Sequence, residues 1–150
     1  MTIKHEIFIE KELDLVWRAW TEEDRVKAWL APAARIEPWE GGKYELYFSP
    51  NDQGPTGCRL IKYEQPRALQ FEWKGPEIFA ETMNQDGDLT MVQVNFKQLE
   101  DLTRLSVMHI GWKNTPQGMA ARQWHVRTWL QLLDELKAEL ESKESILSRP

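Results

Sequence analysis

The chain of 150 residues contains a single cysteine, Cys58, so no disulfide can form within it and nothing indicates an oxidising compartment. Residues 1–14 lack the uninterrupted apolar stretch of a signal peptide, and no window approaches the ~20 apolar residues of a membrane span. Runs of like charge long enough to form an interaction tail are also missing. We therefore expect a soluble protein of the cytoplasm, with no membrane span.

Signatures of metal binding and of common catalytic sites are equally scarce. The three histidines, at positions 5, 109 and 125, show no HExxH spacing, and a lone cysteine cannot supply a CxxC pair. The motifs of serine hydrolases, phosphate-binding loops and dinucleotide-binding folds are absent. The 19 basic and 24 acidic residues give a net charge of −5, which disfavours a nucleic-acid surface. We expect no metal and no cofactor, and the sequence favours a binding protein over an enzyme.

Tryptophan, in contrast, is abundant. Eight indoles occur, at positions 17, 20, 29, 39, 73, 112, 124 and 129. Each can bury roughly 150–250 Å² and carries one N–H that needs a partner when buried. So many large rings indicate either a densely braced core or a hollow built for an apolar guest.

Alternation and helical spacing predict the order of elements. Residues 3–10 alternate as a strand, and two short helices follow: one at 13–20, the other capped by Thr21 and ended by Pro32. Between 33 and 112 the pattern predicts strands at 33–39, 43–49, 57–63, 68–74, 90–99 and 103–112. Residues 50–57 and 75–88 are expected to be loops.

One long amphipathic helix closes the chain. Thr115 suits the N-cap and Pro116 the first helical position, and apolar residues keep helical spacing to about Lys143. We expect one domain over residues 1–143 and a flexible tail over 144–150. The fold class is α+β, with an antiparallel sheet that curls around the final helix.

Short motifs throughout the chain support a family resemblance. They are Val16-Trp17, Trp29-Leu30, Gly41-Gly42, the stretch from Gly57 through Pro66 and Leu69 to Trp73, the stretch from Thr103 and Leu105 to His109 and Gly111, and Trp129 with Leu133, Leu136 and Leu140. With these residues the chain resembles the helix-grip (START/Bet v 1-like) domains of the START/SRPBCC superfamily, in particular the branch named after the activator of heat shock protein 90 ATPase. The resemblance implies a curved antiparallel β-sheet wrapped around a long C-terminal α-helix, with two short helices after the first strand.

The chain departs from that family at two points. Thr128 stands where glycine often precedes the C-terminal tryptophan. The founding co-chaperones also carry a further N-terminal domain, which is not seen in these 150 residues.

A sheet gripped by a helix encloses a space that could hold a small molecule. The expected lining comes from the sheet and the final helix, with His109 and His125 placed to fix a polar end of the ligand: Tyr44, Phe48, Phe71, Trp73, Val94, Leu105, His109, His125, Val126 and Trp129. The alternative is that these rings fill the space themselves and that the histidines are hydrogen-bonded core residues.

Three functions stay open at this stage. The first is binding of a small apolar or aromatic molecule. The resemblance implies the other two. One is a co-chaperone that binds a chaperone ATPase, and the other is a cyclase or dehydratase that uses His109 as acid or base. The resemblance also implies a homodimer. Glu45 and Glu72 alternate away from the apolar face, which predicts a solvated surface for them. Lys62 either lies on that surface or, since it shares the parity of Leu60, reaches the cavity.

Overall fold

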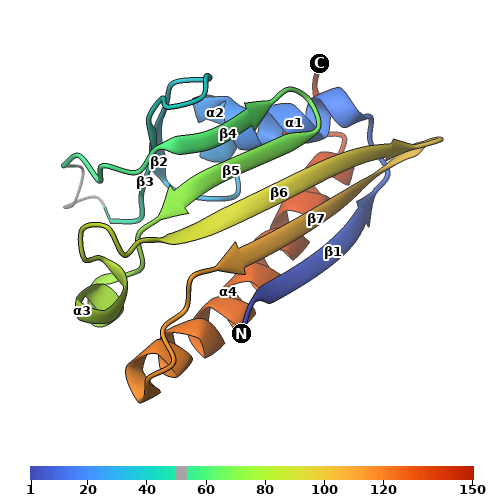
Figure 1. The fold of residues 1–150 in the computed structure, drawn as a ribbon. Coiled ribbons are helices and arrows are strands. Elements are labelled where there is room, and N and C mark those ends of the chain that lie inside the picture. Colours follow the sequence, from blue (N-terminus) through green and yellow to red (C-terminus); the bar gives the residue numbers. More distant parts are fainter. Residues whose placement is uncertain (50–53) are drawn as a thin grey trace.

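A bent antiparallel sheet and one long helix form the body of the structure (Figure 1). The computed structural model describes residues 1–49 and 54–150. The sheet has the strand order β1-β7-β6-β5-β4, and its inner face packs on helix α4. The strands and the helix are β1 (Ile3–Ile9), β4 (Leu60–Glu64), β5 (Ala68–Trp73), β6 (Thr90–Leu99), β7 (Leu102–Ile110) and α4 (Pro116–Glu141). The helix-grip fold expected from the sequence is confirmed.

A smaller layer covers one end of this body. It consists of the helices α1 (Leu13–Thr21) and α2 (Glu23–Val26) and a two-stranded sheet of β2 (Ala33–Ile36) and β3 (Tyr44–Tyr47). A β-bridge between Lys43 and Arg59, together with backbone hydrogen bonds such as that from Tyr44 to Cys58 at 3.0 Å, connects this small sheet to the start of β4. Side chains of α1 reach the main core, where Trp17 meets Phe96 edge to face at 5.1 Å between ring centroids.

Alternation along β6 and β7 separates the two faces of the main sheet. Val94 pairs with Val107 and Phe96 with Leu105, and all four side chains are buried. The residues between them face outward and are at least partly exposed. This period of two is the pattern that the sequence displays, and it fixes which side of the sheet meets α4.

Helix α4 begins as the sequence predicts. The Thr115 hydroxyl accepts a hydrogen bond from the Gly118 amide at 3.0 Å, and Pro116 occupies the first turn. Polar side chains of α4 also reach the free edge of β1: Lys137 donates to the Phe8 carbonyl and Arg122 to the Met1 carbonyl. These bonds satisfy backbone groups that an edge strand would otherwise leave unpaired.

The prediction that Thr21 caps the second helix is wrong. Thr21 is the last residue of α1, and its hydroxyl donates to the Trp17 carbonyl at 3.1 Å. The extended residue Glu22 separates α1 from α2, which is a single turn. A hydroxyl can bond back to its own helix as readily as it can cap the next one, so the sequence alone does not distinguish the two.

Residues 75–88, expected to be a loop, contain a 3₁₀ turn η1 (Glu77–Phe79) and a helical turn α3 (Ala80–Met83). Met83 is buried against Gly75, and the Asn84 side chain exchanges two hydrogen bonds with the Gly75 backbone, at 2.8 and 3.0 Å. The loop expected at 50–57 falls partly on residues 50–53, which lie outside the described residues.

The last residues, for which the sequence predicts a flexible tail, pack against the rest of the chain. They contain the 3₁₀ turn η2 (Ile146–Ser148), in which Leu147 is fully buried. The guanidinium of Arg25, itself buried, donates to the carbonyls of Ile146, Leu147 and Arg149. The sequence conceals this arrangement because the partners lie more than 120 residues apart.

None of the described helices combines the length and hydropathy needed to cross a membrane.

We expect Leu147→Ala to lower the free energy of unfolding by about 2–5 kcal/mol, the range for a truncated buried leucine. The neighbouring Ile146 is 43% exposed, so Ile146→Ala should change stability by no more than ~0.5 kcal/mol. Urea denaturation of the two variants and the parent protein measures both values. Equal effects of the two substitutions would contradict the packing of the C-terminal segment.

Candidate functional site

Eight of the ten residues expected to line a cavity do lie together between the sheet and α4. All eight are buried, and they come from β3, β5, β6, β7 and α4: Tyr44, Phe71, Trp73, Val94, Leu105, His109, His125 and Trp129. Their rings touch: Tyr44 stacks on Phe71 at 4.1 Å, and Trp73 lies 5.3 Å from Trp129, both measured between centroids. These eight residues thus belong to one buried cluster.

The other two residues lie at its margin. Phe48 follows β3 and is 45% exposed, although its ring still approaches Trp73 at 5.4 Å. Val126 is half-buried, because one residue along a helix turns the side chain about 100° away from the inward direction of His125.

Hydrogen bonds join each of the two buried histidines to one indole, and we call these four residues the histidine–indole network. Trp129 Nε1 donates to His109 Nδ1 at 3.0 Å, and Trp73 Nε1 donates to His125 Nε2 at 3.1 Å. The remaining imidazole nitrogens contact the Thr90 hydroxyl at 2.8 Å and the Ala121 carbonyl at 2.7 Å. Each ring nitrogen of both histidines thus has a partner.

This network fixes the protonation of both rings. An indole N–H can only donate, so the imidazole nitrogen that it meets must carry no proton. The other nitrogen then donates, to Thr90 Oγ1 from His109 and to the Ala121 carbonyl from His125. Both histidines are neutral, each in one tautomer. With no free nitrogen, His109 offers little support for the acid–base hypothesis.

The pKa directions agree with neutral rings. Burial lowers the pKa of His109 well below its usual value, and the neighbouring His125 lowers it further. Burial lowers the pKa of His125 to about 4, although its bond to the Ala121 carbonyl acts in the opposite direction. Desolvation opposes the charged form of an imidazole, which explains both shifts.

The rings leave little room for a guest. The hollow at Tyr44, Phe48 and Trp73 measures about 10 Å³, about the smallest space that holds one water. Deeper in, Trp20 stacks on Trp129 with 6.1 Å between centroids and meets Trp29 edge to face at 4.7 Å. In this structure the aromatic side chains fill the interior.

Glu45 is not solvated, contrary to expectation. It is buried on β3, where it accepts hydrogen bonds from the Tyr47 hydroxyl at 2.5 Å and the Gly57 amide at 3.2 Å. Burial alone would raise its pKa, but these bonds outweigh it and the pKa is lowered. Burial, together with the Glu45 carboxylate, raises the pKa of Tyr47 to about 12. Alternation failed here because all four residues of β3 are buried, on both faces.

An apolar groove that the sequence did not reveal lies between η1–α3 and the first half of α4. Its volume is about 400 Å³, and it is lined by Glu77, Ile78, Phe79, Ala80, Glu81, Thr82, Gln117 and Ala120. Ile78 is 74% exposed, and Met119 and Trp124 are exposed nearby on α4. We call this hollow, with its eight lining residues, the α3–α4 groove. The sequence signal was weak because residues 75–88 lack periodicity and Trp124 lies off the buried stripe of α4.

Phe79 connects the groove to the interior. Its ring meets Trp124 edge to face at 5.9 Å and lies 6.4 Å from His125, both measured between centroids. His125 in turn bonds Trp73. The groove is thus separated from the histidine–indole network by a single aromatic ring.

The described residues contain no group of three His, Cys, Asp or Glu side chains that could hold a metal ion. Cys58 is buried, and burial raises the pKa of its thiol. A protonated, buried thiol is a poor nucleophile, so Cys58 contributes packing rather than thiol chemistry.

Known structures share this architecture. A Mesorhizobium loti protein matches with a TM-score of 0.75 and 19% identity, over 96% of this chain and 99% of that one. The Aha1 dimer from Colwellia psychrerythraea matches with a TM-score of 0.75 and 19% identity, over 97% and 99%. An HSP90 activator from Plasmodium falciparum matches with a TM-score of 0.70 and 15% identity, over 93% and 96%. A search of curated protein sequences found no match.

The chain therefore has the helix-grip fold of these structures. Its residues 12–141 match the sequence profile of the Activator of Hsp90 ATPase homolog 1-like proteins, and the chain belongs to that family. The resemblance seen in the sequence is confirmed.

We expect the fold to lose stability in mild acid because of the two buried histidines. Their pKa values are depressed in the folded state, so the unfolded chain binds more protons below its histidine pKa of 6.5. The contribution of the neutral histidines to the free energy of unfolding is therefore fully present above pH 6.5. It falls as the pH drops, by about 1.4 kcal/mol per histidine between pH ~7.5 and ~5.5. Urea denaturation at the two pH values measures the loss.

The matched variant is His125→Gln, because a glutamine amide can accept from Trp73 and donate to Ala121 without titrating. Its loss of stability between the two pH values should be about 1.4 kcal/mol smaller than that of the parent protein. A pH dependence as steep as in the parent would mean that His125 is not held neutral.

Proposed function

We propose that the chain binds a small, largely apolar or aromatic molecule in the α3–α4 groove. The observation that carries this proposal is the exposure of Ile78, an isoleucine 74% open to solvent at the rim of a 400 Å³ groove. A hollow of this size, apolar with a few polar groups, is the usual form of a small-molecule site. One of the larger hollows, at α1, has the charged residues Asp14, Arg18 and Glu22 in its lining and is more polar.

The rim determines the polarity of the ligand. Glu77 and Glu81 flank the apolar lining, and Gln117 is the polar residue that α4 contributes. Two carboxylates repel an anion and accept hydrogen bonds, so the groove favours a neutral or cationic molecule that carries a donor group.

The filled interior forms the floor of this site. A ligand that went deeper, among Phe71, Trp73 and Trp129, would have to displace Phe79 and break the bond between Trp73 and His125. Breaking that bond leaves a buried N–H without a partner, at a cost of about 1–3 kcal/mol. The proposal therefore places the ligand against Phe79 and Trp124, with His125 beneath.

We expect Ile78→Asp to weaken binding of the neutral fluorescent probe Nile red at least about tenfold, because it removes an apolar contact and adds a charge. The matched control is Ile61→Asp, since Ile61 is also an exposed isoleucine but lies on β4. Titration followed by probe fluorescence measures both. Equal affinities for the two variants, or no saturable binding by the parent protein, would refute this site.

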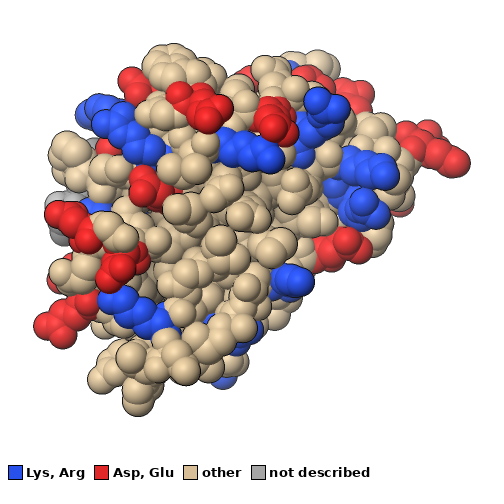
Figure 2. Space-filling model, viewed as in Figure 1, with Lys and Arg blue, Asp and Glu red and all other residues tan. Residues whose placement is uncertain are grey.

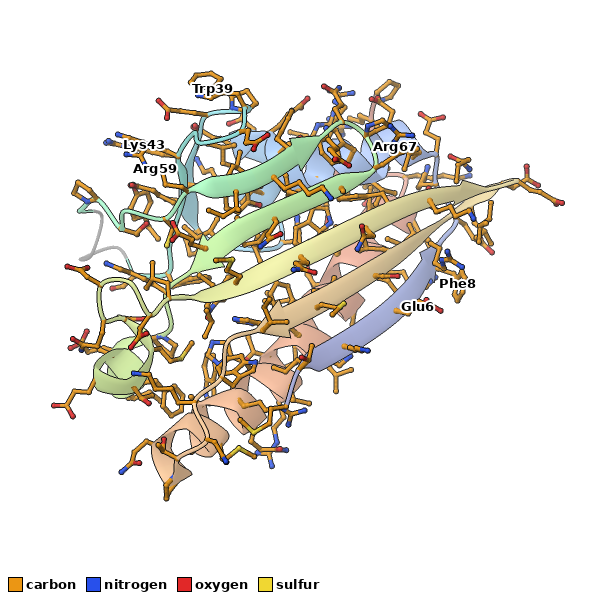
Figure 3. All side chains as sticks on the ribbon, viewed as in Figure 1. Glu6, Phe8, Trp39, Lys43, Arg59 and Arg67 are labelled. Carbon is orange, nitrogen blue, oxygen red and sulfur yellow. The ribbon has the colours of Figure 1, made fainter. Side chains whose placement is uncertain are left out.

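A protein partner is the second candidate function, and a separate surface favours it. Trp39 is 55% exposed in the turn between β2 and β3, and Lys43 and Arg59 lie next to each other where β3 and β4 begin (Figure 3). We call these three residues the Trp39 patch. Tryptophan and arginine are the residues that most often dominate protein interfaces, and the two cations favour an acidic partner.

The related HSP90 activator from Plasmodium falciparum suggests a chaperone ATPase as that partner. If so, Trp39→Ala should reduce the affinity for purified Hsp90 at least about tenfold, as measured by titration of its ATPase rate. Ile78→Asp should leave that affinity unchanged, because the α3–α4 groove is a different surface. No effect of the parent protein on the ATPase, and no binding to it, would exclude this partner.

A further inference from the structure

The outer face of the main sheet is open and almost without charge at its centre. Helices α1 and α4 both pack on the inner face, and among the described residues no helix covers the outer one. Figure 2 shows this face with acidic and basic side chains around its margin and a broad uncharged area between them. The residues of this area come from β5, β6 and β7: Ala68, Gln70, Met91, Gln93, Asn95, Ser106, Met108 and Ile110.

Two neighbouring rows of side chains cross the middle of this face, between a row of Ile110, Met91 and Glu72 on one side and a row of Phe8, Arg104 and Lys97 on the other. The first row, read from edge to edge, is Lys4–Met108–Gln93–Gln70–Lys62. The second row is Glu6–Ser106–Asn95–Ala68–Glu64. The rows are about 7 Å apart, since they are separated by two residues along each strand.

Each edge of the face thus carries one lysine and one glutamate, in the same order. Lys4 and Glu6 stand on β1, and Lys62 and Glu64 stand on β4. Neither Lys4 nor Glu6 has an ion pair within the described residues, while Lys62 and Glu64 form a loose, half-exposed one at 3.6 Å. The first row is therefore basic at both ends and the second row acidic at both ends.

This pattern is self-complementary under one symmetry operation. A twofold axis that runs across the strands, between the two rows, places the first row of one copy on the second row of the other. Lys4 then faces Glu6 of the partner subunit, and the same exchange occurs between Lys62 and Glu64 on β4. An axis along the strands would instead place lysine on lysine and glutamate on glutamate.

We propose that the outer sheet face is the interface between two copies of this chain, related by that crosswise axis. Depletion of charge at the centre and enrichment of methionine are typical of protein interfaces. The marginal ion pairs set register and orientation more than affinity.

The lengths of the side chains fit two bent sheets packed back to back. Each sheet bends away from the other, because it curves around its own α4 (Figure 1). The gap is then narrowest at the centre, where Asn95 and Ser106 are short, and widens toward β1 and β4. Long lysine and glutamate side chains occur at those two edges and can span the wider gap.

Sedimentation of the full chain across a range of concentrations tests the proposal. The parent protein should form a dimer. Lys4→Glu alone, or Glu6→Lys alone, should raise the dimer dissociation constant at least about tenfold, because the twofold axis turns both β1 pairs into repulsive ones. Gln93→Lys should also raise it, by placing like charges on either side of the axis.

The decisive measurement mixes the two charge-reversed chains in equal amounts. The Lys4→Glu chain presents two acidic residues at the β1 edge, and the Glu6→Lys chain presents two basic residues there. A heterodimer of the two chains should therefore form with about the affinity of the parent dimer. The matched control is Asp134→Lys on the exposed side of α4, which should leave the dissociation constant unchanged. Thermal unfolding of each variant confirms that it is folded.

Two results would overturn the proposal. One is a monomer at every concentration, whether or not another protein binds this face. The other is a dimer whose dissociation constant is the same for Lys4→Glu, Gln93→Lys and the parent protein, since a different surface would then hold the two copies together.

Discussion

Two hydrogen bonds from indole to imidazole hold this fold in its particular arrangement. They join the sheet to the helix that it grips, because Trp129 and His125 belong to α4 while His109 and Trp73 belong to the sheet. Hydrophobic contact would tolerate some sliding of the helix along the sheet. A hydrogen bond depends on direction, and two of them, at separate points, do not tolerate such sliding. The network therefore fixes the position of α4 along the sheet as well as the rotation of the helix about its axis.

The architecture was accessible from the sequence because it depends on local periodicity. Alternation in β6 and β7 and the stripe from Ala121 to Leu140 both reflect one buried face per element. The inward direction of His109 and His125 followed from the same rule. The identity of their partners did not, because it depends on rings brought together from three separate elements, β5, β7 and α4.

The features that the sequence missed are those decided by distant packing. Glu45 is buried because the small sheet has cover on both sides, and the C-terminal segment is ordered because Arg25 reaches it. The α3–α4 groove was missed for a related reason: a groove forms between two elements, and neither Ile78 nor Trp124 is unusual within its own segment. Sequence patterns thus located the core better than they located the surfaces on which binding depends.

The uneven exposure of the eight tryptophans gives the molecule an optical property. Six indoles are buried, while Trp39 and Trp124 are open to water. These two lie on different surfaces, one in the β2–β3 turn and one beside Phe79. A water-soluble quencher would reach them first, and the buried six would supply a steady background emission. The chain therefore carries a natural light-emitting reporter on each of two surfaces, with no added label.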